Sequence, residues 1–558
     1  MPRLRHGTQA IAGLCLLLAI VHTWPLATSP ATLSRNDNAD AQLNEWIMAW
    51  VAHQLPRVPA HLFDGNIFYP ARDSLAFSEP LIVPALMGAP MYWLGASPVL
   101  VFNIILLLGF ALTAWAGYTL AFEWTGDRAA GILAGSMFAF NTHTLTRLAH
   151  MQGIHAWGLP LALLAADRLL VHGRWRDAVW LAVWMAAMAY TSGYLIVFAA
   201  VMIAVVILAR VPDWWQRPGR AAMLFGGATL LAAVAVVPAY LPYRRVARLG
   251  MVRSIEAVTD FSATLKGYLA AAGRIHFSTW SSGFWANPVD AFFPGFVVIA
   301  LAGAAIVWAI TSVRNRHENR AHAETAASTA LGRRRIAMLV AIAATGVILS
   351  LGTRTPVYGW LYQVFPPMQG LRAASRFGNL FLLGMAVLSA YGLAALRPRL
   401  STKWASLVAV ALVVLSNVEQ LRAPLFYSRF SGIPPIYSLL AEEPGRVVLV
   451  EVPFYPPQGV FQNGTYVLNS TAHWRPLMNG YSGYTPGPYR KFAESFWYFP
   501  REHAIQAMRR AGATHVMIHP GSFGNEAEQA QMWHDVAASP YLERIATTPG
   551  GPALYRLK

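Results

Sequence analysis

The sequence predicts a mainly α-helical protein that crosses a membrane about eleven times and ends in a small α/β domain. Of its 558 residues, 56% are hydrophobic and only 12% are charged, which is about half the charged fraction of an ordinary soluble protein. Apolar stretches of roughly 20 residues recur along the first 420 positions, and each can cross a hydrocarbon core about 30 Å thick. Beyond that point, short strand-like runs alternate with loops. These observations predict the fold class.

The basic interruptions between apolar segments orient the chain. Lys and Arg are enriched in the cytoplasmic loops of membrane proteins, so we place five segments in the cytoplasm: Met1–His6, His172–Arg176, Arg210–Arg220, Arg314–Arg335 and Arg397–Lys403. The expected spans are then 8–28, 98–122, 129–146, 154–171, two within 176–210, 219–243, 291–313, 335–352, 376–396 and 404–420. This arrangement predicts a cytoplasmic N-terminus and a periplasmic C-terminal domain.

The segment 80–95 is apolar, yet we expect it not to cross. If it crossed, the chain between the basic segments Met1–His6 and His172–Arg176 would cross the membrane five times. An odd number of crossings cannot connect two cytoplasmic segments. The segment is short and contains Pro80, Pro84 and Pro90, which are costly inside a spanning helix. We therefore expect it to lie along the periplasmic surface. The chain then divides into a membrane domain over 1–420, with a periplasmic loop at 29–97, and a domain over 421–558.

The formal net charge of +17 does not predict nucleic-acid binding, because much of the Lys and Arg lies in short loops between spans. The only cysteine, Cys15, lies in the first apolar segment, so an internal disulfide or cysteine metal cluster is excluded. The sequence contains no HExxH, GxxxxGK[ST] or GxGxxG pattern. Their absence argues against a zinc hydrolase, a nucleotide-driven pump and a nucleotide-sugar Rossmann enzyme.

The C-terminal part reads as a small α/β domain, with RVVLVEVPF and THVMIHP as its buried strands. Between them lies the aromatic, glycine-rich loop STAHWRPLMNGYSGYTPGPY. This loop could line a groove, or it could simply pack on the rest of the protein.

Acidic residues gather in the first periplasmic loop. In SRNDNADAQLNEWIMAWVAHQL, apolar positions share one helical face, and the opposite face carries Asp37, Asp40 and Asn44. We expect an amphipathic helix with its carboxylates facing water. Further along, Asp64 follows in HLFDGNIFYPARDSLAFSEPL, and Glu79 directly precedes Pro80. Such carboxylates can be a solvated helix face, or they can take a proton and bind a metal.

Basic residues lie on the same predicted side of the membrane. Arg147 and His150 (TRLAHMQ) end one span, and Arg372 and Arg376 (LRAASRF) precede another. A third cluster lies at 244–253. Arginine on the outer face runs against the usual charge bias. It can snorkel to lipid headgroups, or it can stabilise a phosphate leaving group.

The order of an N-terminal span, an acidic loop (NDNADAQLNEW), a surface helix after Glu-Pro (SEPLIVPAL) and many further spans resembles the GT-C superfamily of integral-membrane glycosyltransferases. It looks similar to bacterial members near the protein mannosyltransferase and aminoarabinose transferase groups. The resemblance implies that Asp40 is the catalytic residue, with Asp37 as the second candidate, and that Glu79 is a second acidic residue of the site. From their place in the same loop, we expect Asp64 and Asn44 to be possible supporting residues.

The resemblance also implies that the donor is a polyprenyl-phosphate-linked sugar surrounded by membrane lipid, and that the acceptor is an unidentified periplasmic molecule. Transfer would invert the anomeric configuration and take place at the bacterial inner membrane. Arg372, Arg376, Arg147 and His150 would then bind the donor phosphate. The segment TRLAHMQ occurs where the mannosyltransferase pattern has an acidic residue. The sequence therefore does not decide whether the protein binds a divalent cation. Two alternatives remain: a transporter or flippase, and a non-catalytic assembly protein for an envelope polysaccharide.

Overall fold

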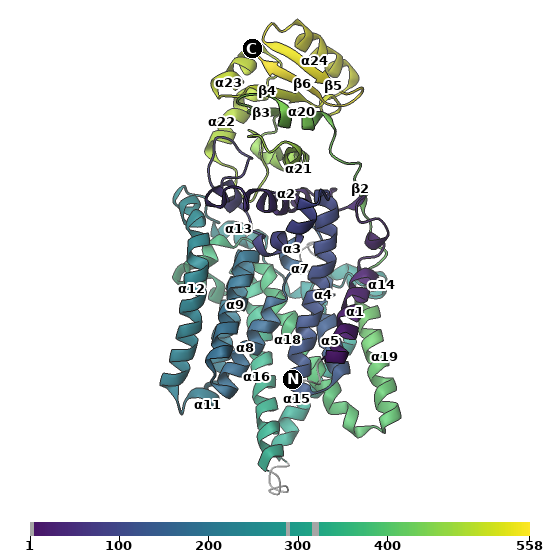
Figure 1. The fold of residues 1–558 in the computed structure, drawn as a ribbon. Coiled ribbons are helices and arrows are strands. Elements are labelled where there is room, and N and C mark those ends of the chain that lie inside the picture. Colours follow the sequence, from purple (N-terminus) through teal and green to yellow (C-terminus); the bar gives the residue numbers. More distant parts are fainter. Residues whose placement is uncertain (1–4, 286–290, 315–322) are drawn as a thin grey trace. The chain divides into compact units, whose positions relative to one another are not determined.

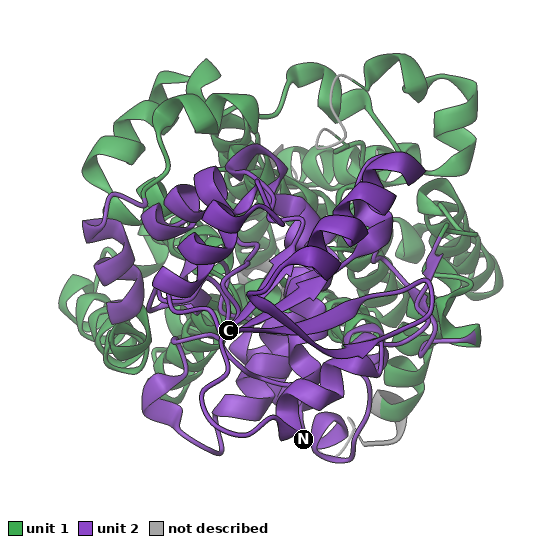
Figure 2. Ribbon diagram, turned by 90° about the horizontal axis from the view of Figure 1, so that it is seen from above, with its two compact units in different colours: residues 1–28, 105–240, 252–426 green, residues 29–104, 241–251, 427–558 purple. Residues whose placement is uncertain are grey.

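The computed structural model describes residues 5–285, 291–314 and 323–558. Its contacts divide the chain into two compact units (Figure 2). Unit 1 comprises residues 1–28, 105–240 and 252–426, and unit 2 comprises 29–104, 241–251 and 427–558. The first loop therefore shares a unit with the C-terminal part of the chain. The basic segments Met1–His6 and Arg314–Arg335 fall partly outside the described residues.

Each predicted span contains a helix (Figure 1): α1 (Arg5–His22), α4 (Pro98–Thr125), α5 (Arg128–Ala139), α8 (Gly158–His172), α9 (Trp175–Thr191), α10 (Gly193–Ala209), α12 (Pro218–Arg248), α15 (Phe296–Arg314), α16 (Ala323–Ser350), α18 (Gly378–Leu396) and α19 (Thr402–Gln420). Within the described residues, five helices are long and apolar enough to cross a membrane, including α4, α12 and α19. The protein is thus mainly helical with several membrane-length apolar helices, while the number of spans stays a prediction.

Shorter helices connect these elements: α6 (Thr142–Leu145), α7 (Met151–Ile154), α11 (Val211–Trp214), α13 (Ile255–Asp260), α14 (Arg274–Thr279) and α17 (Pro356–Val364). Helix α18 is the centre of unit 1, because α5, α15 and α16 all pack against it. Small residues allow helices to approach closely. At Gly135 of α5, an added Cβ would lie 2.2 Å from the carbonyl oxygen of Ala114 on α4. Any larger side chain at Gly135 would force these two helices apart.

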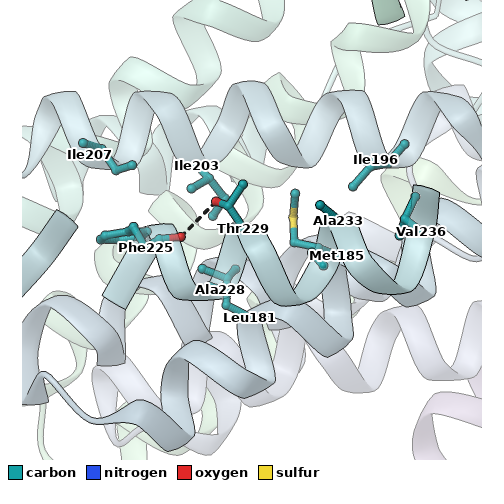
Figure 3. Close-up of a pocket in the computed structure, with 11 residues that line it drawn as sticks. Leu181, Met185, Ile196, Ile203, Ile207, Phe225, Ala228, Thr229, Ala233 and Val236 are labelled. Atoms are coloured by element: carbon teal, nitrogen blue, oxygen red, sulfur yellow. Dashed lines mark hydrogen bonds between the residues drawn. The ribbon is translucent and has the colours of Figure 1, made fainter. Parts of the chain in front are cut away.

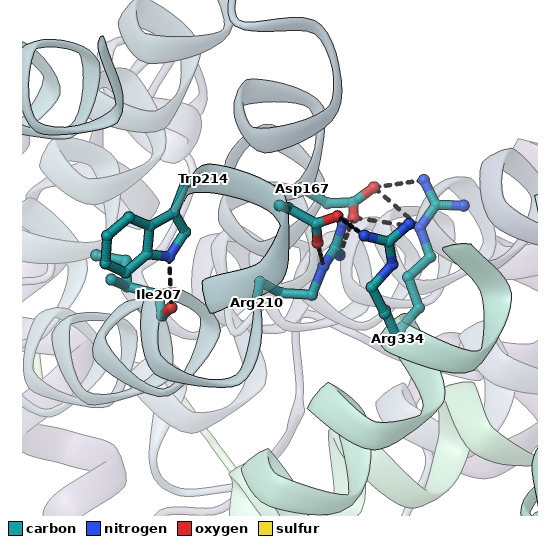
Figure 4. A network of polar contacts seen from close by, with 7 residues as sticks. Asp167, Ile207, Arg210, Trp214 and Arg334 are labelled. Carbon is teal, nitrogen blue, oxygen red and sulfur yellow. Dashed lines mark hydrogen bonds and ion pairs between the residues drawn. The ribbon is translucent and has the colours of Figure 1, made fainter. Parts of the chain in front are cut away.

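A network of buried ion pairs joins three elements of unit 1 (Figure 4). Asp167 of α8 accepts hydrogen bonds from Arg210, at 2.6 Å, and from Arg335 of α16, whose closest contact is also 2.6 Å. Asp213 of α11 pairs with Arg210 and Arg334. The side chains of Asp167 and Arg210 are fully buried. Both oxygens of each carboxylate are therefore paired with guanidinium groups.

Unit 2 contains a four-stranded sheet in the order β3-β4-β6-β5. Strands β3 (Leu449–Val452) and β4 (His515–Ile518) are parallel and fully buried, whereas β6 (Ala553–Leu557) is antiparallel to both β4 and β5 (Leu542–Thr547). The two strands that the sequence predicted are thus confirmed. The remaining helices of this part are α20 (Ile436–Glu442), α21 (Gly464–Asn469), α22 (Gly487–Phe496), α23 (Glu502–Arg510) and α24 (Glu526–Ala538).

The first loop adds helices α2 (Ala39–Gln54) and α3 (Ile82–Trp93) to unit 2, and the two pack against each other. Strand β1 (Leu33–Ser34) pairs with β2 (Ser428–Arg429). At about 1.5 Å per residue, the twelve residues of α3 span roughly 18 Å, which is too short to cross a bilayer. This length agrees with the expectation that 80–95 does not cross, although its surface position stays a prediction.

Candidate active site

Asp40 lies in the first turn of α2, where two polar groups hold it. The side chain of Asn38 caps the helix and accepts a hydrogen bond from the Asp40 N–H at 2.8 Å. The hydroxyl of Tyr481 donates to Asp40 Oδ1 at 2.7 Å. The helix dipole favours a carboxylate at this end, and Asp40 itself is half-buried. The arrangement fixes one oxygen of Asp40 and its position at the start of the helix.

Tyr481 belongs to the aromatic loop 470–489, whose contribution the sequence left undecided. Helix α21, which precedes this loop, packs against α2, and Gln42 Nε2 donates to Thr465 Oγ1 at 3.0 Å. An added Cβ at Gly464 would lie 2.3 Å from Gln42 Oε1, so glycine permits this close approach. Tyr481 was missed as a site residue because 441 positions separate it from Asp40. The only sequence signal was the aromatic and glycine-rich composition of its loop.

Helix α2 does not have the water-facing polar side that the sequence predicted. All residues from Ala41 to Ala52 are buried, including Asn44 at 4% and Glu45 at 0% exposure. The expectation was wrong because helical periodicity shows which residues share a face, while packing by α3, α21 and the neighbouring turns covers the polar face as well. Asn44 is thus a buried residue of α2.

Glu45 is the most deeply buried carboxyl group of this helix. Burial raises its pKa well above the usual value, and a hydrogen bond with Asn36 only partly opposes that effect. With its nitrogen directed toward Glu45, the Asn36 amide lies 2.9 and 3.0 Å from the two carboxyl oxygens. Glu45 therefore joins α2 to the segment that precedes Asp40.

The two supporting acids lie in different surroundings. Asp37 is exposed and forms an ion pair with Arg35 at 3.1 Å, before α2 begins. Asp64 is half-buried, and burial alone would raise its pKa. The hydrogen bonds from His61 and from the Asp73 N–H, together with the charges of His61 and Arg72, outweigh burial and hold the pKa of Asp64 below its usual range.

Glu79 is half-buried between the 3₁₀ turn Ser74–Phe77 and α3. The segment 241–251 joins this region within unit 2. Arg245 binds both carboxylate oxygens of Asp73, at 2.6 and 2.8 Å, and the Tyr243 hydroxyl donates to the Ser78 carbonyl at 2.9 Å. These contacts explain why an arginine lies at position 245 of the basic cluster 244–253.

The predicted phosphate-binding residues all belong to unit 1. The Tyr194 hydroxyl accepts hydrogen bonds from the backbone N–H groups of Arg372 and Ala373, both at 2.9 Å. The guanidinium of Arg376 lies 4.5 Å from the Tyr194 ring centroid, and that of Arg372 lies 4.4 Å from the ring of Phe261. Tyr194 and these cation–π contacts fix the loop and leave Arg372 exposed and Arg376 half-buried.

Arg147 and His150 lie in the short connection between α6 and α7, and both are half-buried. The carbonyl of Leu145 at the end of α6 accepts a hydrogen bond from Arg422 Nη1 at 3.0 Å, which ties this connection to the end of α19. Asp40 and Glu79 belong to unit 2, whereas the four cationic residues belong to unit 1. Their joint action on one substrate stays a prediction.

A cavity of about 260 Å³ lies among α9, α10 and α12 (Figure 3). Apart from Thr229, its lining is entirely hydrophobic: Leu181, Met185, Ile196, Ile203, Ile207, Phe225, Ala228, Ala232, Ala233 and Val236. The Thr229 hydroxyl donates to the carbonyl of Phe225 in its own helix at 2.9 Å. The lining of the cavity is therefore suited to an apolar chain, because its one polar side chain already has a hydrogen-bond partner.

Within the described ranges, no group of three or more His, Cys, Asp or Glu residues is arranged to hold a metal ion. Asp64 and Asp73 are close, since the Asp73 N–H donates to Asp64 Oδ1 at 3.0 Å, but His61 and Arg245 already occupy their carboxylates. A divalent cation at Asp40 and Glu79 stays a prediction.

No family model and no curated protein matches this sequence. Among solved structures, the chain is similar to the arabinofuranosyltransferase AftD from Mycobacteria, with a TM-score of 0.60 at 16% identity; the match covers 99% of this chain and 40% of AftD. The oligosaccharyltransferase AglB from Archaeoglobus fulgidus, solved with an inhibitory peptide and a dolichol-phosphate, gives a TM-score of 0.46 at 13% identity, covering 99% of this chain and 74% of AglB. ArnT from Cupriavidus metallidurans, bound to undecaprenyl phosphate, gives 0.41 at 12% identity, covering 98% of this chain and 97% of ArnT.

The likeness to AftD defines the class of fold. The chain shares its fold with this arabinofuranosyltransferase, as the resemblance of its loop motifs to the GT-C superfamily led us to expect. It spans less than half the length of AftD. At this identity the likeness concerns the fold, and activity has to be argued from the residues themselves.

Proposed function

We propose that this protein is a membrane glycosyltransferase that moves a sugar from a polyprenyl-phosphate donor to an acceptor outside the cytoplasm. The observation that carries the proposal is the placement of Asp40. It is a half-buried carboxylate in the first turn of α2, held by the Asn38 cap and by the Tyr481 hydroxyl. A base has to be positioned before it can take a proton from an acceptor hydroxyl. The GT-C fold around it supports the same class of reaction.

The proposed reaction is a single in-line displacement. The acceptor oxygen bonds to the anomeric carbon of the sugar while Asp40 takes the hydroxyl proton. The bond from that carbon to the phosphate oxygen breaks, and the polyprenyl phosphate leaves with the electron pair. One displacement inverts the anomeric configuration. Glu79 would hold the acceptor or a divalent cation. Cations stabilise the departing phosphate, and Arg372, Arg376, Arg147 and His150 are the proposed residues.

The apolar cavity among α9, α10 and α12 supports a lipid-linked donor. An isoprenoid chain is hydrocarbon and needs no polar partner, and the lining supplies none beyond the internally bonded Thr229. Burying apolar surface stabilises binding by roughly 25 cal/mol per Å². Replacing Ala232 with Trp, which would fill the cavity, should raise the KM for a long-chain donor and leave that for a short-chain donor unchanged.

The decisive experiment uses the purified full chain in lipid nanodiscs with a radiolabelled polyprenyl-phosphate sugar. We expect Asp40→Asn to lower kcat at least about a hundredfold, because the base is lost. Asp37→Asn is the matched control, since Asp37 is exposed and its carboxylate pairs with Arg35 at the surface. If Asp40→Asn turns over normally, or if Asp37→Asn is the inactive variant, the assignment of Asp40 is wrong. If the native chain consumes no donor, the proposed function itself fails.

The proposal includes an orientation. The N-terminus would be cytoplasmic, the membrane domain would extend over 1–420, and 421–558 would be periplasmic, as the basic segments suggest. Reporter fusions at Gln42 and Lys558 test it. Both sites should report the periplasm, and a cytoplasmic signal at either one contradicts the arrangement.

A further inference from the structure

The residues directly before Tyr481, at 476–480, are hydrogen-bonded to β3, which is an edge strand of the C-terminal sheet. The Leu449 N–H donates to the Pro476 carbonyl, and the Met478 N–H donates to the Leu449 carbonyl, both at 2.9 Å. The pairing is parallel. The segment 476–480 thus continues the sheet beyond β3, and its position follows that of the sheet.

Asn479 fixes the same segment to β3 through its side chain. Its Oδ1 accepts a hydrogen bond from the Glu451 N–H at 2.7 Å, and its Nδ2 donates to the Glu451 carbonyl at 2.9 Å. Asn479 is 0% exposed, and hydrogen bonds are stronger in the interior of a protein than in water. One side chain therefore binds both backbone groups of a β3 residue, which prevents the segment from sliding along the strand.

The first loop binds the alternate residues of the segment. The Leu477 N–H donates to the Asn66 carbonyl at 2.7 Å, and the Phe68 N–H donates to the Asn479 carbonyl at 3.0 Å. Phe68 also leaves no room for a side chain at position 480, since an added Cβ at Gly480 would lie 2.5 Å from its ring. The segment is therefore hydrogen-bonded to the first loop as well as to β3.

Two aromatic residues next to this segment have a left-handed backbone, Phe68 with a φ of 62° and Trp474 with a φ of 56°. This conformation is unfavourable for bulky side chains. Such strain collects at functional sites, where the surrounding structure maintains it. The strain indicates that the fold requires a particular path for the chain that leads to Tyr481.

Tyr481 binds the side chain of Asp40, whereas the Asn38 cap binds the Asp40 backbone N–H. The Tyr481 hydroxyl donates to Asp40 Oδ1 at 2.7 Å. Such a hydrogen bond restrains the carboxylate and favours its charged form, which is the form that accepts a proton. The position and the charge of the proposed base therefore both depend on a hydroxyl that the C-terminal sheet holds in place.

We propose that the C-terminal sheet of unit 2 is a scaffold for Asp40, and that Tyr481 is the positioning residue through which the sheet acts. Asp40 remains the base. Tyr481 keeps its carboxylate charged and restrained, and the segment 476–480 keeps Tyr481 in place. This inference rests on the proposed function and deepens it, because it gives the residues 427–558 a part in the transfer step.

The test compares Tyr481→Phe with the native full chain in nanodiscs. The donors are undecaprenyl phosphates linked to radiolabelled glucose, mannose or arabinofuranose, and release of undecaprenyl phosphate is measured with water as the acceptor. Tyr481→Phe should lower kcat about tenfold, the effect of one lost hydrogen bond, and leave the KM for the donor unchanged. The acid limb of the pH profile of kcat should move up by about one pH unit, because the charged form of the carboxylate loses a donor.

Tyr541→Phe is the matched control. The Tyr541 hydroxyl also donates to a carboxylate, that of Glu502 at 2.6 Å, so kcat and the acid limb should both stay native. A native kcat in Tyr481→Phe overturns the proposal. A lower kcat with an unmoved acid limb overturns it as well, since the loss would then come from general damage to the fold. A native chain that consumes none of the donors contradicts the proposed function instead.

Gly480→Ala tests whether the sheet acts through Tyr481. The added Cβ would meet the Phe68 ring and shift the end of the segment, so kcat should fall as in Tyr481→Phe. In the Tyr481→Phe background, Gly480→Ala should change kcat less than about twofold, because the contact that it disturbs is already missing. Equal losses in both backgrounds overturn the scaffold role. Gly487→Ala is the control, since an added Cβ there meets no atom within 4 Å, and kcat should stay native.

Discussion

The carboxyl groups in the interior of the two units have different hydrogen-bond partners. In unit 1, fully buried Asp167 and half-buried Asp213 are surrounded by guanidinium groups, and each of their oxygens is paired. In unit 2, Glu45 and Glu451 are fully buried, but Glu45 has the neutral amide of Asn36, and Glu451 keeps one oxygen without a partner among the described residues.

This difference separates buried acidic residues that hold the fold together from buried acidic residues that are available to a ligand. A carboxylate whose two oxygens both pair with guanidinium groups has no oxygen left for a ligand, and its removal destabilises the fold. A buried polar atom without a hydrogen-bond partner lowers the stability of the fold, and a ligand can supply the missing partner. Replacing the carboxyl groups themselves should therefore affect stability in unit 1 and ligand binding or the pH dependence of stability in unit 2.

The largest expected effect is that of Asp167→Asn. This change leaves buried Arg210 and Arg335 without one of their counter-charges, which should destabilise the protein by about 3–5 kcal/mol. Thermal unfolding of the purified chain measures it. Asp535→Asn, at an exposed residue that pairs with Gln531, should leave the midpoint unchanged. Equal midpoints for the two variants would mean that the network of Figure 4 does not hold α8 to α16.

Tyr437→Phe should cost about 1–3 kcal/mol in thermal unfolding, because it removes a hydrogen bond to the buried carboxyl group of Glu451. Tyr541→Phe, which removes a hydroxyl that pairs with exposed Glu502 at 2.6 Å, should change the stability very little. Each variant lacks one oxygen atom of the native chain, so the comparison isolates the buried hydrogen bond. Similar losses in both variants would show that the hydrogen bond to Glu451 contributes little to stability.

Glu45→Gln should change the pH dependence of stability. Burial raises the pKa of Glu45 well above its usual 4.5, so the folded chain keeps a proton that the unfolded chain releases. Stability from this group is complete below about pH 4.5 and falls as pH rises toward the folded pKa, by up to about 1.4 kcal/mol per pH unit. Glutamine cannot ionise, so the variant should gain stability over the native chain as the pH rises above about 4.5. Parallel unfolding curves over that range would contradict a neutral Glu45.

The smallest effect is expected at the cap of α2. Asn38→Ala removes the acceptor for the Asp40 N–H and should cost about 1 kcal/mol of stability. If the cap also positions Asp40, kcat should fall while the KM for the donor stays constant. Asn525→Ala, which removes the corresponding cap of α24, is the control and should leave kcat unchanged.

Several features were predictable because they depend on local pattern. Apolar length placed a helix in every expected span, and runs of β-branched residues gave β3 and β4. Parity and three prolines set 80–95 apart, and its helix α3 is indeed short and belongs to unit 2. The polar face of α2 was predicted wrongly, since periodicity cannot tell that α3 and α21 cover it.

The sequence by itself determined the membrane-length helices, the two strands β3 and β4 and the acidic loop, because hydrophobicity and chain length are properties of neighbouring residues. Only the tertiary structure brought Tyr481 to Asp40, Arg245 to Asp73 and His519 to Glu451. The reason is physical: side chains separated by 68 to 441 positions meet only through packing, and packing is a property of the whole fold.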